Sequence, residues 1–223
     1  MFCDYHVHTD FSDDSIYKMK NVVKDAISLG LKEICFTDHV DYEKYYIEYL
    51  QLVAEYKNKI NLKMGLEFGM QRHTIDDFEK LFKRYPFDCI LLSVHQINDV
   101  EFWTGEYQKG KTQEEYNLEY YEELLYLVKH YHNYSVLAHL DLITRYDSAG
   151  IISFELIKPV ITEILKTVIA DGKGIEFNTS WHRYGLQDTT PSREILKLYK
   201  ELGFTRFCTY DKMKPIFHRL EEI

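Results

Sequence analysis

The chain has 223 residues, 45% hydrophobic and 28% charged, with 27 Lys and Arg against 36 Asp and Glu for a formal net charge of −9. This apolar content excludes a disordered chain, and the acidic balance argues against a general binder of nucleic acids or anionic membranes, because such binders carry basic surfaces. The length suits one domain over residues 1–223, and the first predicted strand begins too early to leave room for a signal peptide. We therefore expect a single soluble, cytoplasmic domain.

The predicted elements alternate between strands and helices along the chain. Seven apolar, β-rich runs predict strands at Phe2–His6, Glu33–Thr37, Leu62–Phe68, Phe87–His95, Ser135–Leu140, Gly174–Ser180 and Thr205–Tyr210. Segments with helical periodicity lie between them at Met19–Leu29, Glu43–Lys59, Ile75–Arg84, Gln113–His130, Phe154–Ala170 and Ser192–Leu202. Parallel strands need such helical crossovers, so the pattern predicts an α/β fold, either a (β/α) barrel one unit short of eight or an open doubly wound sheet.

Two long connections interrupt this alternation, at residues 96–111 and 181–190. Loops of this length in compact domains often cover a substrate, although position alone leaves a purely structural role equally open. The four cysteines stand far apart within strand-like runs, which predicts buried, reduced thiols and not a zinc ribbon or a redox pair.

Ionisable residues follow most of the predicted strands. The strand ends carry His6, His8, Asp38, His39, Glu67, His95, His139, Asp141 and Asp211. Side chains at the carboxyl ends of parallel strands converge, and histidines and carboxylates are costly to bury without partners. One such histidine is usually a satisfied core residue, but this set predicts a metal centre of imidazole and carboxylate ligands.

The number of candidate ligands exceeds the four or five that one ion needs, so we expect at least two ions, with Glu67 as a natural bridge. Paired cations of this kind activate water and clamp the oxygens of a phosphate ester during in-line displacement. Hydrolysis of phosphate esters is therefore the predicted chemistry.

The motifs that carry these residues resemble the polymerase-and-histidinol-phosphatase (PHP) superfamily, in the same order along the chain. They are Asp4-Tyr5-His6-Val7-His8-Thr9, Phe11-Ser12-Asp13-Asp14-Ser15, Phe36-Thr37-Asp38-His39, Gly65-Leu66-Glu67, Ser93-Val94-His95 and Ala138-His139-Leu140-Asp141-Leu142. The segments Glu101–Gly105, Lys109–Thr112, Asp141–Tyr146 and Asn178–Ser180 are similar to the histidinol-phosphatase branch. The resemblance extends to about residue 215 and implies a distorted (β/α)7 barrel.

The resemblance also implies three metal ions. Imidazole and carboxylate ligands bind Zn, Fe and Mn alike, so the ions could be any of these. His6, His8, Glu67 and Asp211 would hold the first ion, Glu67, His95 and His139 the second, and Asp14 and His39 the third. The family places a further histidine two residues after the final aspartate, and this chain has Met213 there. A thioether is a poor ligand for these ions, so two or three ions are expected.

Two arginines follow the fifth and sixth strands, and the resemblance implies that Arg145 and Arg183 bind the substrate phosphate. A guanidinium offers a planar fork of donors that matches phosphate oxygens. The other reading of a loop arginine is a solvated charge.

The resemblance implies a histidinol-phosphatase that hydrolyses L-histidinol phosphate to L-histidinol and phosphate in histidine biosynthesis. We expect a metal-activated hydroxide as the nucleophile and leave the general acid unassigned. One alternative is another PHP phosphoesterase, acting on a different small phosphate or on a phosphotyrosyl protein. A second is a degenerate, non-catalytic phosphate-binding member, which Met213 would favour.

Overall fold

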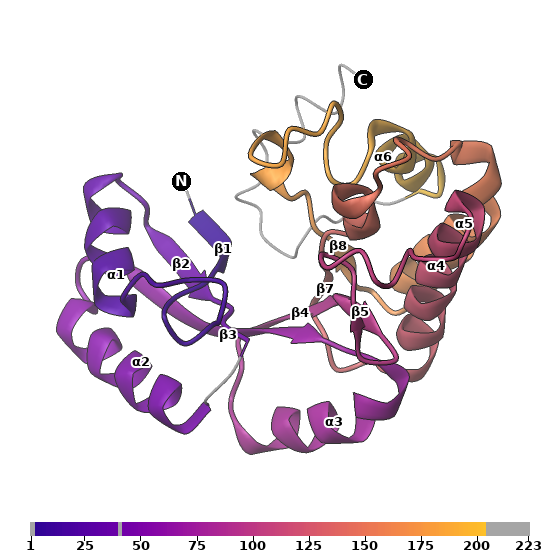
Figure 1. The fold of residues 1–223 in the computed structure, drawn as a ribbon. Helices are drawn as coiled ribbons and strands as arrows, with labels where there is room; N and C mark the ends of the chain where they lie inside the picture. The colour runs from indigo at the N-terminus through magenta and orange to yellow at the C-terminus, as the bar shows by residue number, and fades with distance from the viewer. Residues whose placement is uncertain (1–2, 40–41, 204–223) are drawn as a thin grey trace. The chain divides into compact units, whose positions relative to one another are not determined.

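The computed structural model describes residues 3–39 and 42–203 (Figure 1). The α-helices are α1 (Met19–Ser28), α2 (Tyr42–Tyr56), α3 (Ile75–Arg84), α4 (Gln113–His130), α5 (Phe154–Ala170) and α6 (Arg193–Glu201). The strands are β1 (Cys3–Val7), β2 (Glu33–Phe36), β3 (Asn61–Gly69), β4 (Cys89–Ser93), β5 (Gln96–Ile97), β6 (Val100–Glu101), β7 (Val136–Leu137) and β8 (Gly174–Ile175). Within the described ranges, no helix combines the length and the apolarity needed to cross a membrane.

The α/β fold class is confirmed. Each of the six predicted helices is present, and each of the first six predicted strands has a counterpart in β1, β2, β3, β4, β7 or β8. The seventh predicted strand, Thr205–Tyr210, lies outside the described residues, so closure into a seven-stranded barrel stays a prediction.

The chain divides into two compact units, one of residues 1–68 and 80–91 and the other of residues 69–79 and 92–223. In the first unit, β1 pairs in parallel with β2, and β2 pairs in parallel with β3. All four residues of β2 are buried, which is typical of an inner strand of a parallel sheet. That one domain spans the whole chain stays a prediction.

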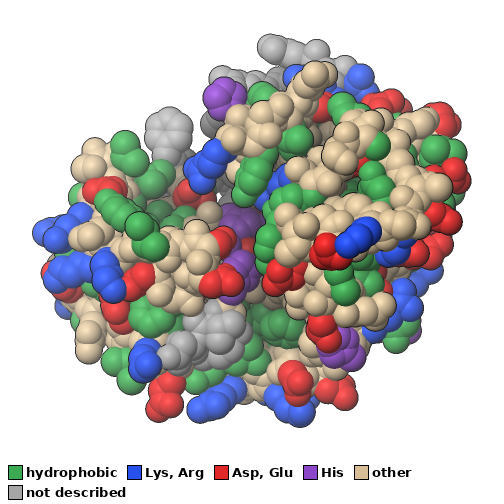
Figure 2. All heavy atoms as spheres, in the orientation of Figure 1, with side chains coloured by type: hydrophobic (Ala, Val, Ile, Leu, Met, Phe, Trp, Pro, Cys, Tyr) green, Lys and Arg blue, Asp and Glu red, His purple; other side chains and the backbone are tan. Residues whose placement is uncertain are grey.

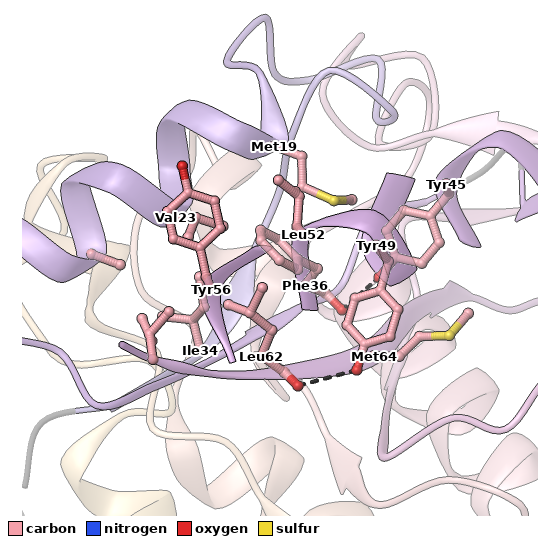
Figure 3. Packing of buried hydrophobic residues seen from close by; sticks show 12 residues of the cluster. Met19, Val23, Ile34, Phe36, Tyr45, Tyr49, Leu52, Tyr56, Leu62 and Met64 are labelled. Carbon is pink, nitrogen blue, oxygen red and sulfur yellow. Dashed lines mark hydrogen bonds between the residues drawn. The ribbon is translucent and has the colours of Figure 1, made fainter. Parts of the chain in front are cut away.

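Helices α1 and α2 cover one face of this sheet with a hydrophobic cluster (Figure 3). The cluster joins Met19 and Val23 of α1 to three tyrosines of α2 and to the buried side chains of β2 and β3. Two of its phenolic groups are satisfied by strand carbonyls: the Tyr49 hydroxyl donates to Leu62 O at 3.1 Å, and the Tyr45 hydroxyl donates to Phe36 O at 2.9 Å. These two rings thus fill the layer with their polar ends paired.

In the second unit, β7 pairs in parallel with β8, and α4 packs along α5. Helix α4 begins at the predicted residue because Thr112 and Glu115 form a reciprocal capping box. The connection at residues 96–111 differs from the predicted open loop, since β5 and β6 form a small antiparallel hairpin in it. Asn98 and Asp99 make its two-residue turn with positive φ, a conformation that these two residue types tolerate.

The sixth predicted strand, Gly174–Ser180, is shorter in the structure and ends at Ile175. Its later part turns because the Asn178 side chain accepts a hydrogen bond from Ser180 N and caps the 3-10 helix η3 (Thr179–His182). Side-chain bonds of this type compete with the strand ladder.

Candidate metal centre

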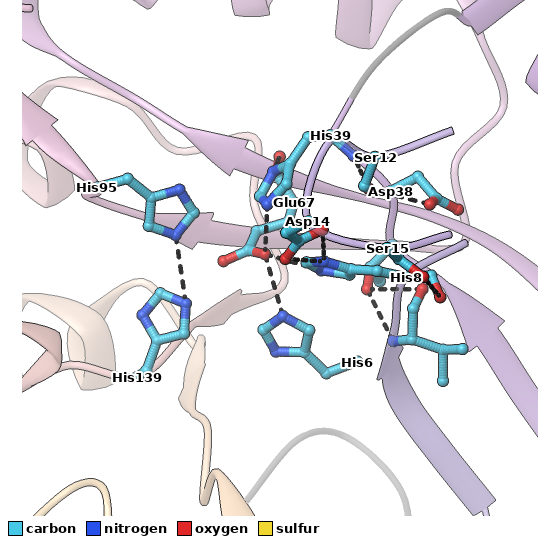
Figure 4. A network of polar contacts seen from close by, with 12 residues as sticks. His6, His8, Ser12, Asp14, Ser15, Asp38, His39, Glu67, His95 and His139 are labelled. Atoms are coloured by element: carbon cyan, nitrogen blue, oxygen red, sulfur yellow. Dashed lines mark hydrogen bonds and ion pairs between the residues drawn. The ribbon is translucent and has the colours of Figure 1, made fainter. Parts of the chain in front are cut away.

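Three carboxyl ends of the first unit's strands deliver histidines and an acid to one place (Figure 4). His6 lies in β1 and His8 directly follows it, so the strand's alternation turns both imidazoles to the same side. His39 follows β2, and Glu67 lies near the end of β3. A backbone hydrogen bond from Thr37 N to Val7 O, 2.8 Å long, joins the ends of β1 and β2.

The Glu67 carboxylate is the common partner of these histidines. Its Oε2 lies 3.0 Å from His6 Nε2, 3.0 Å from His8 Nε2 and 3.3 Å from His39 Nε2. The Glu67 residue is 2% exposed, so this negative charge is removed from bulk water. A buried carboxylate among three imidazoles is stable only with positive charge close by.

A second group of potential ligands adjoins the first. His8 Nδ1 lies 2.9 Å from both carboxylate oxygens of Asp14, and the His8 and His39 rings are 4.7 Å apart edge to face. The ligand atoms of His8, Asp14 and His39 lie within 4.8 Å of one another, as do those of His6, His8 and Glu67. The first unit alone thus brings together five of the eight predicted ligands.

Asp38 anchors the loop that carries His8 and Asp14, a role that the sequence analysis missed although it placed Asp38 at a strand end. The buried Asp38 carboxylate accepts hydrogen bonds from Thr9 N at 2.5 Å and from Ser12 Oγ at 3.0 Å. Ser12 Oγ in turn accepts from His39 N at 2.9 Å. Burial raises the pKa of Asp38 although these donors favour its charged form.

The donor set fits bound divalent metal. His8 Nε2 is buried and makes no hydrogen bond within the described residues, although Glu67 Oε2 is 3.0 Å away. A ring nitrogen and a carboxylate oxygen this close, without hydrogen-bond geometry, have the spacing of two ligands of one cation. Zinc–nitrogen and zinc–oxygen bonds of about 2.0–2.2 Å at the tetrahedral angle would place neighbouring ligand atoms roughly 3.3–3.6 Å apart, slightly farther than this contact.

The second unit brings His95 and His139 together. Their Nε2 atoms face each other at 3.5 Å, and their ring centroids are 5.3 Å apart (Figure 4). Gly69 makes room for His95, because a Cβ at that position would lie 3.0 Å from His95 Nδ1. Two facing imidazole nitrogens at this separation form a competent pair of ligands.

The two predicted phosphate-binding arginines lie in different environments of the second unit. Arg145 belongs to the 3-10 helix η2 (Leu142–Tyr146); its Nη2 donates to Ser180 Oγ at 2.9 Å, and its guanidinium lies 4.4 Å from the centroid of the Tyr184 ring. Arg183 follows η3 and is exposed. Arg145 is therefore held in place, whereas Arg183 lies on the surface.

Asp141 follows β7, and its role in the structure is to hold the start of α6. Its buried carboxylate accepts a hydrogen bond from Ser192 N at 2.8 Å, at the start of α6, and burial raises its pKa to about 7. The remaining predicted ligand, Asp211, and the departure at Met213 lie outside the described residues.

Metal binding is expected to release a proton from His8. Burial lowers the pKa of His8, but the nearby carboxylates of Asp14 and Glu67 outweigh this effect and raise the pKa from 6.5 to about 9. In the metal-free protein, the charged His8 ring therefore adds to the free energy of unfolding. This contribution is fully present below pH 6.5 and is lost as the pH rises through about 9. A metal takes only the neutral ring, so affinity for zinc should rise with pH over this window.

Calorimetric titration of zinc at pH 7.5, in buffers with different ionisation enthalpies, measures this release. The His8→Gln variant should release about one proton fewer than the parent. His73→Gln, which changes an exposed histidine of the second unit, should match the parent. Equal release from His8→Gln and the parent would contradict the assignment.

Comparison with known proteins matches these residues to a family. The profile of the PHP domain matches residues 4–180. Histidinol-phosphatase of Lactococcus lactis is 35% identical over 190 residues, covering 79% of this chain and 71% of the relative. A probable histidinol-phosphatase of Clostridium acetobutylicum is 30% identical over 94% of this chain and 84% of the relative.

The fold is also similar to a solved structure. The crystal structure of the Lactococcus lactis histidinol phosphate phosphatase, complexed with zinc, L-histidinol and phosphate, superposes with a TM-score of 0.84 at 31% identity. The superposition covers 99% of this chain and 92% of the other.

Proposed function

Because the chain belongs to the PHP domain family, we propose that it is a histidinol-phosphatase, a hydrolase that converts L-histidinol phosphate to L-histidinol and phosphate in histidine biosynthesis. The observation that carries this function is the similarity to a histidinol-phosphatase over most of both chains. The cluster of histidines around Glu67 supports it, since the residues that metal-dependent hydrolysis needs are present and close together.

We propose that two or three divalent ions bind at the predicted ligands. His6, His8 and Glu67 form one ligand group of the first unit, His8, Asp14 and His39 form an adjoining one, and His95 and His139 form the pair of the second unit. Zinc in the Lactococcus lactis structure favours zinc over iron or manganese. When bound, such ions supply a water activated for attack on phosphorus and neutralise the charge of the phosphate.

The protein's own groups would bind and orient the substrate. Arg145 can donate to a phosphate oxygen while Ser180 and Tyr184 hold its guanidinium, and Arg183 adds a second cation from the same loop region. A fixed guanidinium stabilises the charge that develops during phosphoryl transfer without reorganising. Asp38 keeps the loop of His8 and Asp14 in the conformation that binds metal.

The surface agrees with a small-molecule substrate. On the face that Figure 2 shows, acidic and basic side chains are interspersed, whereas a nucleic-acid channel presents a basic stripe. We propose a phosphate monoester as the partner, without nucleic acid or membrane, and a cytoplasmic site of action, whose reducing conditions suit cysteines that form no disulfide among the described residues.

Steady-state kinetics of the zinc-loaded protein test this function. The specificity constant for L-histidinol phosphate should exceed that for p-nitrophenyl phosphate by roughly a thousandfold, because binding of the non-reacting imidazole end is expressed in the transition state. Inactivation by a chelator, and recovery with zinc, are the controls. Similar constants for the two esters would favour a general PHP phosphoesterase, and absent phosphate release would favour the non-catalytic alternative.

A further inference from the structure

A line of hydrogen bonds in the second unit joins Arg145 to the acid that follows β8, Glu176. Arg145 Nη2 donates to Ser180 Oγ at 2.9 Å, and the Ser180 hydroxyl donates to Asn178 Oδ1. Asn178 Nδ2 donates to Glu176 Oε1 at 3.2 Å. Ser180 is the direct support of Arg145 in the function proposed above, but Asn178 and Glu176 have no role in it.

The direction of these hydrogen bonds is fixed at both ends. A guanidinium only donates and an ionised carboxylate only accepts. The Ser180 hydroxyl therefore accepts from Arg145 and donates to Asn178, and the Asn178 amide donates its N–H to Glu176. If the amide were reversed, its NH2 group would face Ser180 N, which is itself a donor 2.9 Å from Asn178 Oδ1. The charge of Glu176 therefore sets the orientation of the amide that holds Ser180 and, through it, Arg145.

The other oxygen of Glu176 holds a predicted metal ligand. Glu176 Oε2 accepts a hydrogen bond from His139 N at 2.8 Å, while Glu176 N donates to Leu137 O at 2.8 Å. His139 has a φ of +22°, in the region that residues with a Cβ rarely adopt. Because this backbone is strained, the bond from Glu176 helps to keep the His139 imidazole opposite His95.

Arg145 depends on this line for its orientation. Its Nε is buried and makes no hydrogen bond to the described residues, so Ser180 and the face of Tyr184 are the contacts that direct the guanidinium. A guanidinium that binds phosphate as a fork needs its plane fixed, since a rotated fork matches only one oxygen.

We propose that Glu176 is a positioning residue of the phosphatase reaction, which couples the metal ligand His139 to the phosphate-binding Arg145 through Asn178 and Ser180. The inference rests on the function proposed above for those two residues. One carboxylate thus orders the phosphate-binding arginine and a metal ligand together.

Two substitutions separate the two branches of this network, one from Glu176 to His139 and one from Glu176 through Asn178 to Arg145. Glu176→Gln keeps the shape of the side chain but cannot accept from both His139 N and Asn178 Nδ2, so it should weaken the binding of both inorganic phosphate and zinc by about tenfold or more. Asn178→Ala breaks only the branch to Arg145 and should weaken phosphate binding while zinc binding stays unchanged. Phosphate is titrated into the zinc-loaded protein by calorimetry, and zinc is measured by metal analysis after dialysis against a competing chelator.

Glu123→Gln is the matched control. Glu123 is likewise an acid of the second unit that accepts a backbone and a side-chain donor, from Arg72 N at 3.2 Å and Arg72 Nε at 2.5 Å. It should leave both affinities unchanged. Equal losses in Glu123→Gln and Glu176→Gln would mean general destabilisation and would overturn the inference.

A double-mutant cycle distinguishes this inference from the function on which it rests. In an Arg145→Ala background, Asn178→Ala should no longer change phosphate binding, because the residue that Asn178 orients is gone. If Arg145→Ala weakens phosphate binding but Glu176→Gln and Asn178→Ala do not, the inference fails and the function stands. If none of the three changes phosphate binding, the assignment of Arg145 fails as well.

Discussion

Replacement of Glu67 by alanine is expected to lower phosphatase activity by at least about a hundredfold and to reduce the bound metal, with the fold retained. The reason is that Glu67 Oε2 lies within 3.3 Å of three imidazole nitrogens, those of His6, His8 and His39. Without this buried charge, the three histidines would lose an anionic ligand that lies close to all of them. Metal analysis and phosphate release from L-histidinol phosphate measure the two effects.

Glu33→Gln is the control for this variant. Glu33 is a buried acid of the same sheet, but it lies at the start of β2 and accepts hydrogen bonds from Tyr5 and Asn61. Its substitution should change stability and leave the metal content and rate of the folded protein close to those of the parent. A Glu67→Ala protein with near-normal metal and rate would remove Glu67 from the centre.

Substitution of Gly65 by alanine is expected to destabilise the first unit severely. A Cβ at this position of β3 would lie 2.6 Å from Cys35 Sγ, 2.8 Å from Cys89 O and 2.9 Å from Phe36 O. Two of these atoms belong to the backbone of neighbouring strands and cannot rotate away. Overpacking of this kind costs about 3 kcal/mol, which for a chain of this size lowers Tm by roughly 6–12 °C.

Two further variants test the cause of this loss. Cys35→Ala in the Gly65→Ala background removes the sulfur but leaves both carbonyls, so thermal unfolding should show only partial recovery. Gly30→Ala should cost only about 1–2 kcal/mol, because Gly30 has a φ of +78° and open space around it. Full recovery in the double variant, or a Gly65→Ala protein as stable as the parent, would contradict this explanation.

The elements were predictable from the sequence because their signals are local. Gln113–His130 is predicted and observed with the same bounds, since the capping box and the helical periodicity lie within the segment itself. The strand ends at His6, His39 and Glu67 were predictable for a related reason. Parallel strands point their carboxyl ends the same way, so residues that follow them meet without any knowledge of distances.

The predictions from sequence differ from the structure in two short segments. The run Gly174–Ser180 has the composition of a strand, yet Asn178 takes Ser180 N and turns the chain. The hairpin of β5 and β6 was missed because each strand has two residues, too few for an alternating pattern to appear.

The sequence by itself was enough to predict which residues would carry the chemistry: the histidines and acids at the strand ends, in a family order that indicates phosphate hydrolysis. Only the tertiary structure decided which groups hold those residues in place. Asp38 accepts Thr9 N and Ser12 Oγ from the loop after β1, 26–29 residues away, and Glu176 accepts His139 N from the segment after β7, 37 residues away. An acceptor's role depends on which donors fold against it, and for bonds between distant segments this is a property of the packed chain and not of any local pattern.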